Sequence, residues 1–69
     1  MNITYDQEAD AAYIYFKEIA QGEVVRTISL NDSINIDLDI NGMTLGIEIL
    51  DASKNLPKSA LNSAKILSS

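Results

Sequence analysis

Three carboxylates, Asp37, Asp39 and Glu48, have the spacing in this chain that best suits binding chemistry. With Asn41 and Gly42 they match every fixed position of the EF-hand calcium loop, D-x-[DN]-x-[DN]-G-x₅-E. Such a loop needs oxygen ligands at alternating positions, a glycine for its sharp turn and a glutamate at its twelfth position. The motif therefore raises the hypothesis of a divalent-cation site.

The residues around this motif favour a β-hairpin over an EF-hand. Helices flank an EF-hand loop, whereas residues 34–50 alternate between apolar and polar with period two. Asn41-Gly42 is a strong signal for a two-residue hairpin turn. A turn there places four apolar pairs on one face, namely Ile40 with Met43, Leu38 with Leu45, Ile36 with Ile47 and Ile34 with Ile49.

The opposite face of this hairpin carries the three carboxylates, and two interpretations of it remain open. Asp37 and Asp39 are two apart on one strand, and Glu48 is the diagonal neighbour of Asp37, so the three could hold Ca²⁺ or Mg²⁺. Alternatively, they form a solvated acidic surface that prevents sheets from stacking. Gly46 faces Asp37, and a glycine inside a strand indicates a bulge or the close approach of another backbone.

Catalytic residues are not predicted. The chain has no histidine and no cysteine, so neither an imidazole base nor a thiolate nucleophile exists. Asp37 and Glu48 are the one plausible acid–base pair, and no serine lies in a nucleophile elbow. Tyr13 and Tyr15 share one strand face, which suits either ligand stacking or a core aromatic with its hydroxyl at the rim. A small enzyme is the least favoured alternative, and no cofactor is predicted.

Length and composition limit the remaining possibilities. The 69 residues form a single domain (1–69), and 46% hydrophobic residues suffice for a core. The absence of cysteine excludes disulfides. A net charge of −5 repels phosphate backbones, which argues against nucleic-acid binding and favours a basic protein partner. The N-terminus lacks a signal-peptide pattern and no apolar run would span a bilayer, so we expect a cytoplasmic protein without membrane contact.

The pattern along the chain predicts an α+β fold, a meandering antiparallel β-sheet of about five strands with one C-terminal α-helix. Residues 1–53 form the sheet, with strands over 2–5, 11–17, 23–30 and the two arms of the hairpin. Residues 54–69 hold the helix, in which Pro57 is the first residue and Ala60, Leu61, Ala64 and Leu67 form an apolar stripe. This helix covers too little of the apolar face, which predicts a homodimer.

Three further positions carry specific expectations. The Asp6 carboxylate is placed to accept a backbone N–H two residues on, and Gly22 suits a loop conformation that favours glycine. Arg26 falls on the core face of its strand. Either the strand ends soon after it, so that Arg26 lies at the sheet margin, or a bulge shifts the early half of the strand and turns Val25 inward.

Two separated stretches resemble one family of small prokaryotic domains. The start, ITYDQEADAAYI, resembles the family's "ITYDpeaDalYI", with Tyr5, Asp6, Asp10 and Tyr13 at motif positions and Gln7 where proline is frequent. Asp37, Asp39, Gly42 and the run GIEILDAS from Gly46 resemble its "vDyDe.G.lvGIEIldaS". The family is domain of unknown function 2283 (DUF2283), and the resemblance covers residues 1–53.

This resemblance implies a compact antiparallel sheet domain with no assigned activity. Some relatives look like partners of small toxin-like proteins. The leading functional hypothesis is therefore a small protein-interaction domain, antitoxin-like, that neutralises a basic protein partner through the face of Asp37, Asp39 and Glu48. A divalent-metal-binding domain is the first alternative.

Overall fold

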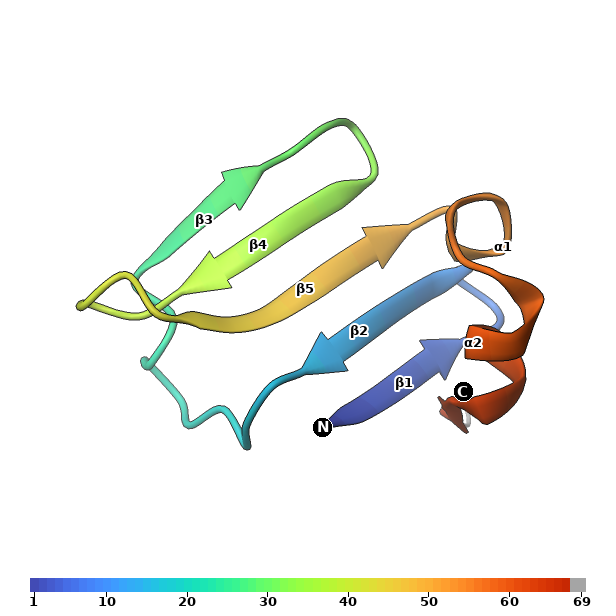
Figure 1. The fold of residues 1–69 in the computed structure, drawn as a ribbon, viewed down its shortest axis with the longest axis horizontal. Helices are drawn as coiled ribbons and strands as arrows, with labels where there is room; N and C mark the ends of the chain where they lie inside the picture. Colours follow the sequence, from blue (N-terminus) through green and yellow to red (C-terminus); the bar gives the residue numbers. More distant parts are fainter. Residues whose placement is uncertain (68–69) are drawn as a thin grey trace.

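A computed structural model describes residues 1–67, which form one mostly antiparallel sheet with two short helices at one end (Figure 1). The strands are β1 (Asn2–Asp6), β2 (Ala11–Tyr15), β3 (Arg26–Ser29), β4 (Ile34–Leu38), β5 (Thr44–Leu50) and β6 (Lys65–Ile66). The helices are α1 (Ala52–Asn55) and α2 (Lys58–Ser63). The α+β class is confirmed.

The strand order is β3-β4-β5-β2-β1-β6, so the prediction of a meander is wrong. Hairpins join β1 to β2 and β3 to β4 to β5, but β2 pairs with β5 and not with β3. The reason is burial. Ala12 and Ile14 of β2 need apolar partners, which Ile49 and Ile47 of β5 provide. All residues of β3 are exposed, which suits the edge of the sheet, and residues 16–25 are long enough to reach it.

One register aligns isoleucines across five strands. Cross-strand pairs run from β3 through β4, β5 and β2 to β1 on a single face of the sheet. We call these residues the isoleucine row: Ile28, Ile36, Ile47, Ile14 and Ile3. This row, together with Ile34 opposite Ile49, defines the apolar face, and the residues that alternate with these isoleucines lie on the polar face.

The hairpin prediction is confirmed away from its turn and wrong beside it. Ile34 pairs with Ile49 and Ile36 with Ile47, as predicted, but Leu38 lies opposite Thr44. The loop has three residues, since the Asp39 N–H donates to the Met43 carbonyl at 3.0 Å, and Gly42 has φ +83°. This is the geometry of a type I turn followed by a left-handed glycine. The predicted pair Ile40 with Met43 does not form, and both side chains are exposed, at 79% and 65%.

A bulge restores the register that this loop shifts. The pairing changes between Asp37 opposite Gly46 and Leu38 opposite Thr44, which leaves Leu45 as an extra residue in β5. Leu45 is only 2% exposed. The bulge therefore returns Ile47 and Ile49 to the apolar face despite the longer loop.

The other local expectations divide between right and wrong. Arg26 is exposed at the first position of β3, opposite Leu38, so it lies at the margin of the sheet, and Val25 is exposed and not turned inward by a bulge. The Asp6 carboxylate accepts the Glu8 N–H at 3.1 Å, and Gly22 has φ +80°.

The predicted C-terminal helix is present in shortened form. Pro57 precedes α2, which ends at Ser63, and residues 65–66 then leave the helix to pair in parallel with β1. Leu67 is therefore not part of a helical stripe; its N–H donates to the Tyr5 carbonyl. Residues 68–69 of the predicted helical segment lie outside the described part of the chain.

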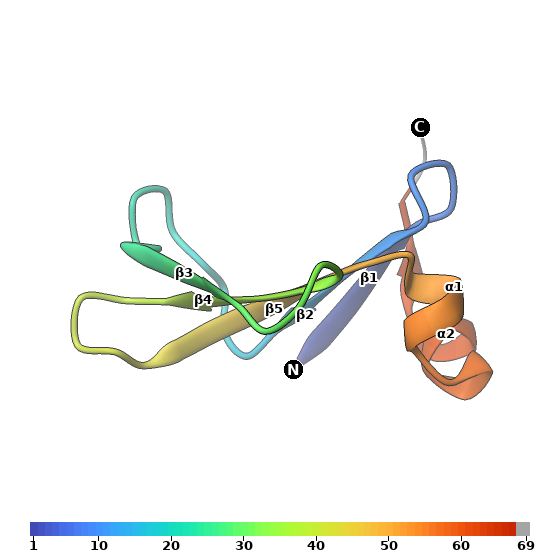
Figure 2. The same ribbon diagram turned by 90° about the horizontal axis from the view of Figure 1, so that it is seen from above.

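The core lies where the helices meet the apolar face. Ala12, Ile49 and Ala52 are buried together, with Leu56 and Leu61 from the helical segment packed against them. Figure 2 shows α1 and α2 on one side of the sheet, at one end only. The apolar face is therefore covered beside Ile49 and open toward β3.

The different burial of two isoleucines gives a stability test. Ile49 is 3% exposed and Ile40 is 79% exposed. We expect Ile49→Ala to lower the free energy of unfolding by about 2–4 kcal/mol, because it opens a cavity in the core, and Ile40→Ala to change it by less than about 0.5 kcal/mol. Urea unfolding of both variants measures this difference. Equal losses would contradict the observed turn.

Candidate functional site

The polar face carries two adjacent hydrogen-bonded groups, which include Tyr13, Asp37 and Glu48 of the residues singled out in the sequence. The Tyr13 hydroxyl donates to the Asp37 carboxylate at 2.5 Å, and the Thr27 hydroxyl donates to its other oxygen at 2.6 Å. Next to this group, the Asn35 amide donates to Glu48 at 3.0 Å, and the Ser29 hydroxyl donates to Asn35. Four strands thus hold one continuous polar surface.

Tyr13 reaches Asp37 by crossing over Gly46. Tyr13 belongs to β2 and Asp37 to β4, and Gly46 of β5 lies between the two strands. A Cβ atom at position 46 would lie 2.6 Å from the Tyr13 hydroxyl oxygen and closer still to the ring. Glycine is therefore required by the close approach of a side chain, and the bulge expected at this position adjoins it.

Burial of the Tyr13 ring raises the pKa of its hydroxyl, and the hydrogen bond to Asp37 raises it further. The Tyr13 hydroxyl is therefore protonated near neutral pH and is the hydrogen-bond donor to Asp37. The neighbouring Tyr15 ring lies with its centroid 4.5 Å from that of Tyr13. Tyr13 lies on the polar face with its hydroxyl bonded to Asp37 across the central strand β5, so it is not a core aromatic with its hydroxyl at the rim, and ligand stacking stays a prediction.

The three predicted carboxylates do not converge on one point. Asp39 lies outside β4, in the turn, where its side chain accepts the backbone N–H groups of Asn41 and Met43 at 2.9 Å each. Asp37 and Glu48 accept from different partners on the polar face. Within residues 1–67, no group of three or more acidic, histidine or cysteine side chains is placed to hold a metal ion. Of this trio, the structure brings only Asp37 and Glu48 onto one surface.

A second cluster involves the family-motif positions Tyr5 and Asp10. The Asp10 carboxylate accepts the Tyr5 hydroxyl at 2.7 Å, the Ser53 hydroxyl at 2.7 Å and the Ser53 N–H at 3.0 Å. The Asp10 carbonyl also accepts the Ala52 N–H at 2.9 Å. Asp51, which precedes α1, makes no side-chain cap. Asp10 therefore caps α1 from a distant part of the chain.

This cap explains the choice of aspartate at position 10. Its backbone has φ +51°, a left-handed conformation that aspartate and asparagine tolerate better than most residues. Hydrogen bonds from the hydroxyls of Ser53 and Tyr5 lower the pKa of the Asp10 carboxyl. The bond between Tyr5 and Asp10 also raises the pKa of the Tyr5 hydroxyl. The hydrogen bonds of this cluster connect the β1–β2 hairpin to α1.

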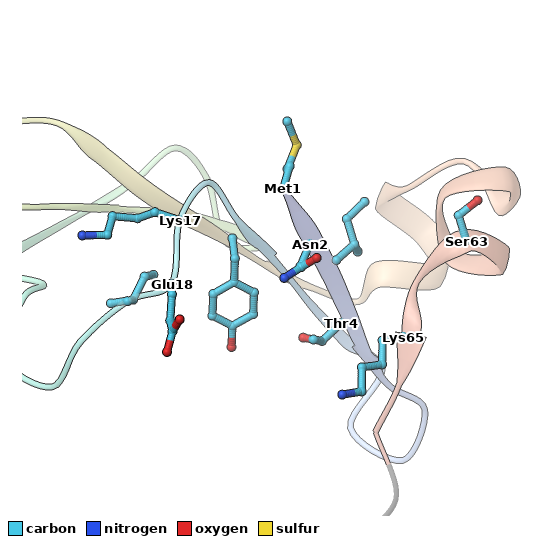
Figure 3. Close-up of a pocket in the computed structure, with 10 residues that line it drawn as sticks. Met1, Asn2, Thr4, Lys17, Glu18, Ser63 and Lys65 are labelled. Atoms are coloured by element: carbon cyan, nitrogen blue, oxygen red, sulfur yellow. The ribbon is translucent and has the colours of Figure 1, made fainter.

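A groove that could not be predicted from the sequence adjoins β1. It has a volume of about 780 Å³ and is open to solvent, and Figure 3 shows its side chains. Its lining comes from residues 1–4, 15–19 and 63–65, which only the folded sheet brings together. Lys17 and Lys65 line it, and Lys17 pairs with Glu23 at 2.5 Å. None of the three predicted carboxylates reaches this groove.

Comparison with known proteins agrees with the motif positions. The family described as "Protein of unknown function (DUF2283)" matches residues 2–53. This chain belongs to the DUF2283 family. An uncharacterised protein of Methanocaldococcus jannaschii is 48% identical over 54 residues, which are 78% of this chain and 43% of that protein. The chain thus spans less than half of this relative's length. No solved structure matches this chain.

The DUF2283 match ends at Ser53, the partner of Asp10. Both hydrogen-bonded clusters therefore lie inside the matched range, whereas α2 and β6 lie outside it. No helix in residues 1–67 is long and apolar enough to cross a bilayer.

The contribution of the Asp10 cluster to the stability of the fold depends on pH. Because the pKa of Asp10 is lower in the folded chain than the ordinary value of about 3.9, its stabilising effect is complete above that value and is lost as the pH falls through the folded pKa. We expect Asp10→Asn to be less stable than the wild type at pH 7, with a smaller difference at pH 3. Thermal melting at both pH values measures this.

Asp51→Asn is the matched control for this experiment. Asp51 also has a left-handed backbone, with φ +48°, but makes no side-chain cap. Its substitution should leave the same difference from the wild type at both pH values. A loss at Asp10 that does not depend on pH would contradict the role of the carboxylate.

The crossing of Tyr13 over Gly46 predicts a coupled pair. Gly46→Ala forces the Tyr13 ring away from Asp37 and should lower the free energy of unfolding by about 1–3 kcal/mol. In a Tyr13→Ala background, the same substitution should have little effect, since the ring is gone. A double-mutant cycle from urea unfolding measures the coupling, and additive losses would contradict the crossing.

Proposed function

We propose that this chain is a protein-interaction domain whose polar, acidic face binds a basic protein partner, in an antitoxin-like role in the cytosol. The observation that supports it is unbalanced charge. Ten acidic residues oppose five basic ones, and among the described residues the single ion pair joins Lys17 to Glu23. Within residues 1–67, nine side-chain carboxylates are thus left without an ion pair.

The polar face suits this role because its carboxylates are held in place. Asp37 accepts hydrogen bonds from Thr27 of the neighbouring β3 and from Tyr13 of β2, and Glu48 accepts one from Asn35 of the neighbouring β4, so their positions are fixed before a partner arrives. Preorganised charges lose little side-chain entropy on binding. Both are half-buried among polar side chains and not fully covered, so they stay accessible to lysine or arginine side chains.

Affinity capture with a tagged chain, from an extract of the cells that contain it, tests this proposal. We expect a basic protein in stoichiometric amount at low salt and its release as salt screens the charges. Asp37→Asn/Glu48→Gln removes two charges with little change of shape, and we expect about tenfold weaker binding.

The matched control removes two charges from exposed loops, Glu8→Gln/Asp32→Asn. It should reduce binding much less. Recovery of no stoichiometric partner by the wild type would overturn the proposal, as would equal losses for the two double variants.

A further inference from the structure

The isoleucine row is covered by this chain at only part of its length. Ile14 and Ile47 pack against the buried cluster of Ala12, Ile49 and Ala52, whereas Ile28 at the β3 end is 40% exposed. None of the five isoleucines is among the buried residues of the chain. In Figure 2, the side of the sheet that carries the helices has no other element over β3 and β4. A sheet with one apolar face is normally completed by a second layer.

The burial of the whole chain is small for its mass. The buried hydrophobic residues are Ala12, Leu45, Ile49 and Ala52, and no large side chain is fully buried. The accessible surface is 4882 Å², whereas a compact monomer of 7.5 kDa exposes roughly 4,250 Å². The excess of about 600 Å² approaches the area of about 800 Å² that each partner buries in a standard interface.

We propose that a second copy of this chain covers the isoleucine row, so that two sheets pack face to face in a homodimer. The distribution of charge favours a copy of the same chain. The strand carboxylates Asp6, Asp37 and Glu48 all lie on the polar face, and Arg26 at the margin is the one charged strand residue of β1 to β5 on the apolar face. Two apolar faces therefore meet without bringing carboxylates together, although each chain carries −5.

The position of the helices also suits a two-fold arrangement. They form a layer on one side of the sheet, at one end only (Figure 2), and a second sheet packs about 10 Å from the first. The partner sheet then fills the open part of that layer, and its own helices lie over the opposite end. Each subunit completes the core that the other leaves open.

Formation of this dimer does not depend on the proposed binding of a basic partner, but the dimer would strengthen that binding. The polar faces point outward on both sides, so a dimer presents two copies of the network around Asp37 and Glu48. A basic partner with two binding regions would then bind with avidity.

Sedimentation equilibrium of the full chain from about 1 to 500 μM tests the proposal. We expect a reversible monomer–dimer equilibrium, with a melting temperature that rises with protein concentration. Ile28→Lys places a charge on the apolar face at an exposed edge position, where the lysine stem lies along the surface and folding is retained. Dimerisation should weaken by at least about tenfold.

Thr27→Lys is the control, because Thr27 is the neighbouring residue of the same edge strand and lies on the polar face. It should leave dimerisation within about twofold of the wild type. A chain that stays monomeric at every concentration overturns the proposal, and so does an assembly larger than a dimer. Equal weakening by both variants also overturns it, since that result indicates edge-to-edge pairing of β3. If Ile28→Lys fails to fold by circular dichroism, the wild-type equilibrium and its melting temperatures still decide.

Discussion

The fold depends on a single register that brings branched apolar side chains opposite one another across five strands. Ile36 faces Ile47, which faces Ile14, and each pair places both side chains on the same side of the sheet. A shift of one residue in any strand would send its isoleucine to the polar face, and in β1, β2, β4 or β5 it would also turn a carboxylate or a tyrosine toward the core. The same register therefore sets the apolar layer and the network around Asp37.

Sequence reasoning identified this register but not the turn that closes it. Asn41-Gly42 favours a two-residue turn, and the predicted pairs of Ile34 and Ile36 do form. The real loop is one residue longer, because the Asp39 carboxylate binds two backbone N–H groups and stabilises a different turn. The bulge at Leu45 offsets the extra residue of the loop, so the predicted pairs are correct beyond the bulge. Alternation is a property of a whole strand, whereas a turn depends on single side-chain contacts that periodicity does not show.

Contacts between distant parts of the chain account for what the sequence could not provide. Asp10 and Ser53 were both recognised as motif residues, but their pairing requires β1, β2 and α1 to be in place. Gly46 was correctly marked as unusual, yet the ring above it comes from Tyr13, 33 positions earlier. The position of β2 beside β5 was missed for the same reason, because hairpin reasoning considers only consecutive strands. Asp37, Asp39 and Glu48 do not form the predicted common site, because the Asp39 side chain binds backbone N–H groups of the turn.

The pairing of β2 with β5 also has a consequence for how the chain folds. The hairpin of β1 and β2 is complete by Tyr15, but the strand that covers the free edge of β2 ends only at Leu50. During synthesis, the first hairpin therefore emerges with one edge of β2 unpaired, and that edge is covered only after more than thirty further residues. Closing a loop of that length costs entropy before any contact repays it, so we expect the β2–β5 pairing to form late in folding and a shortened chain to be prone to aggregation.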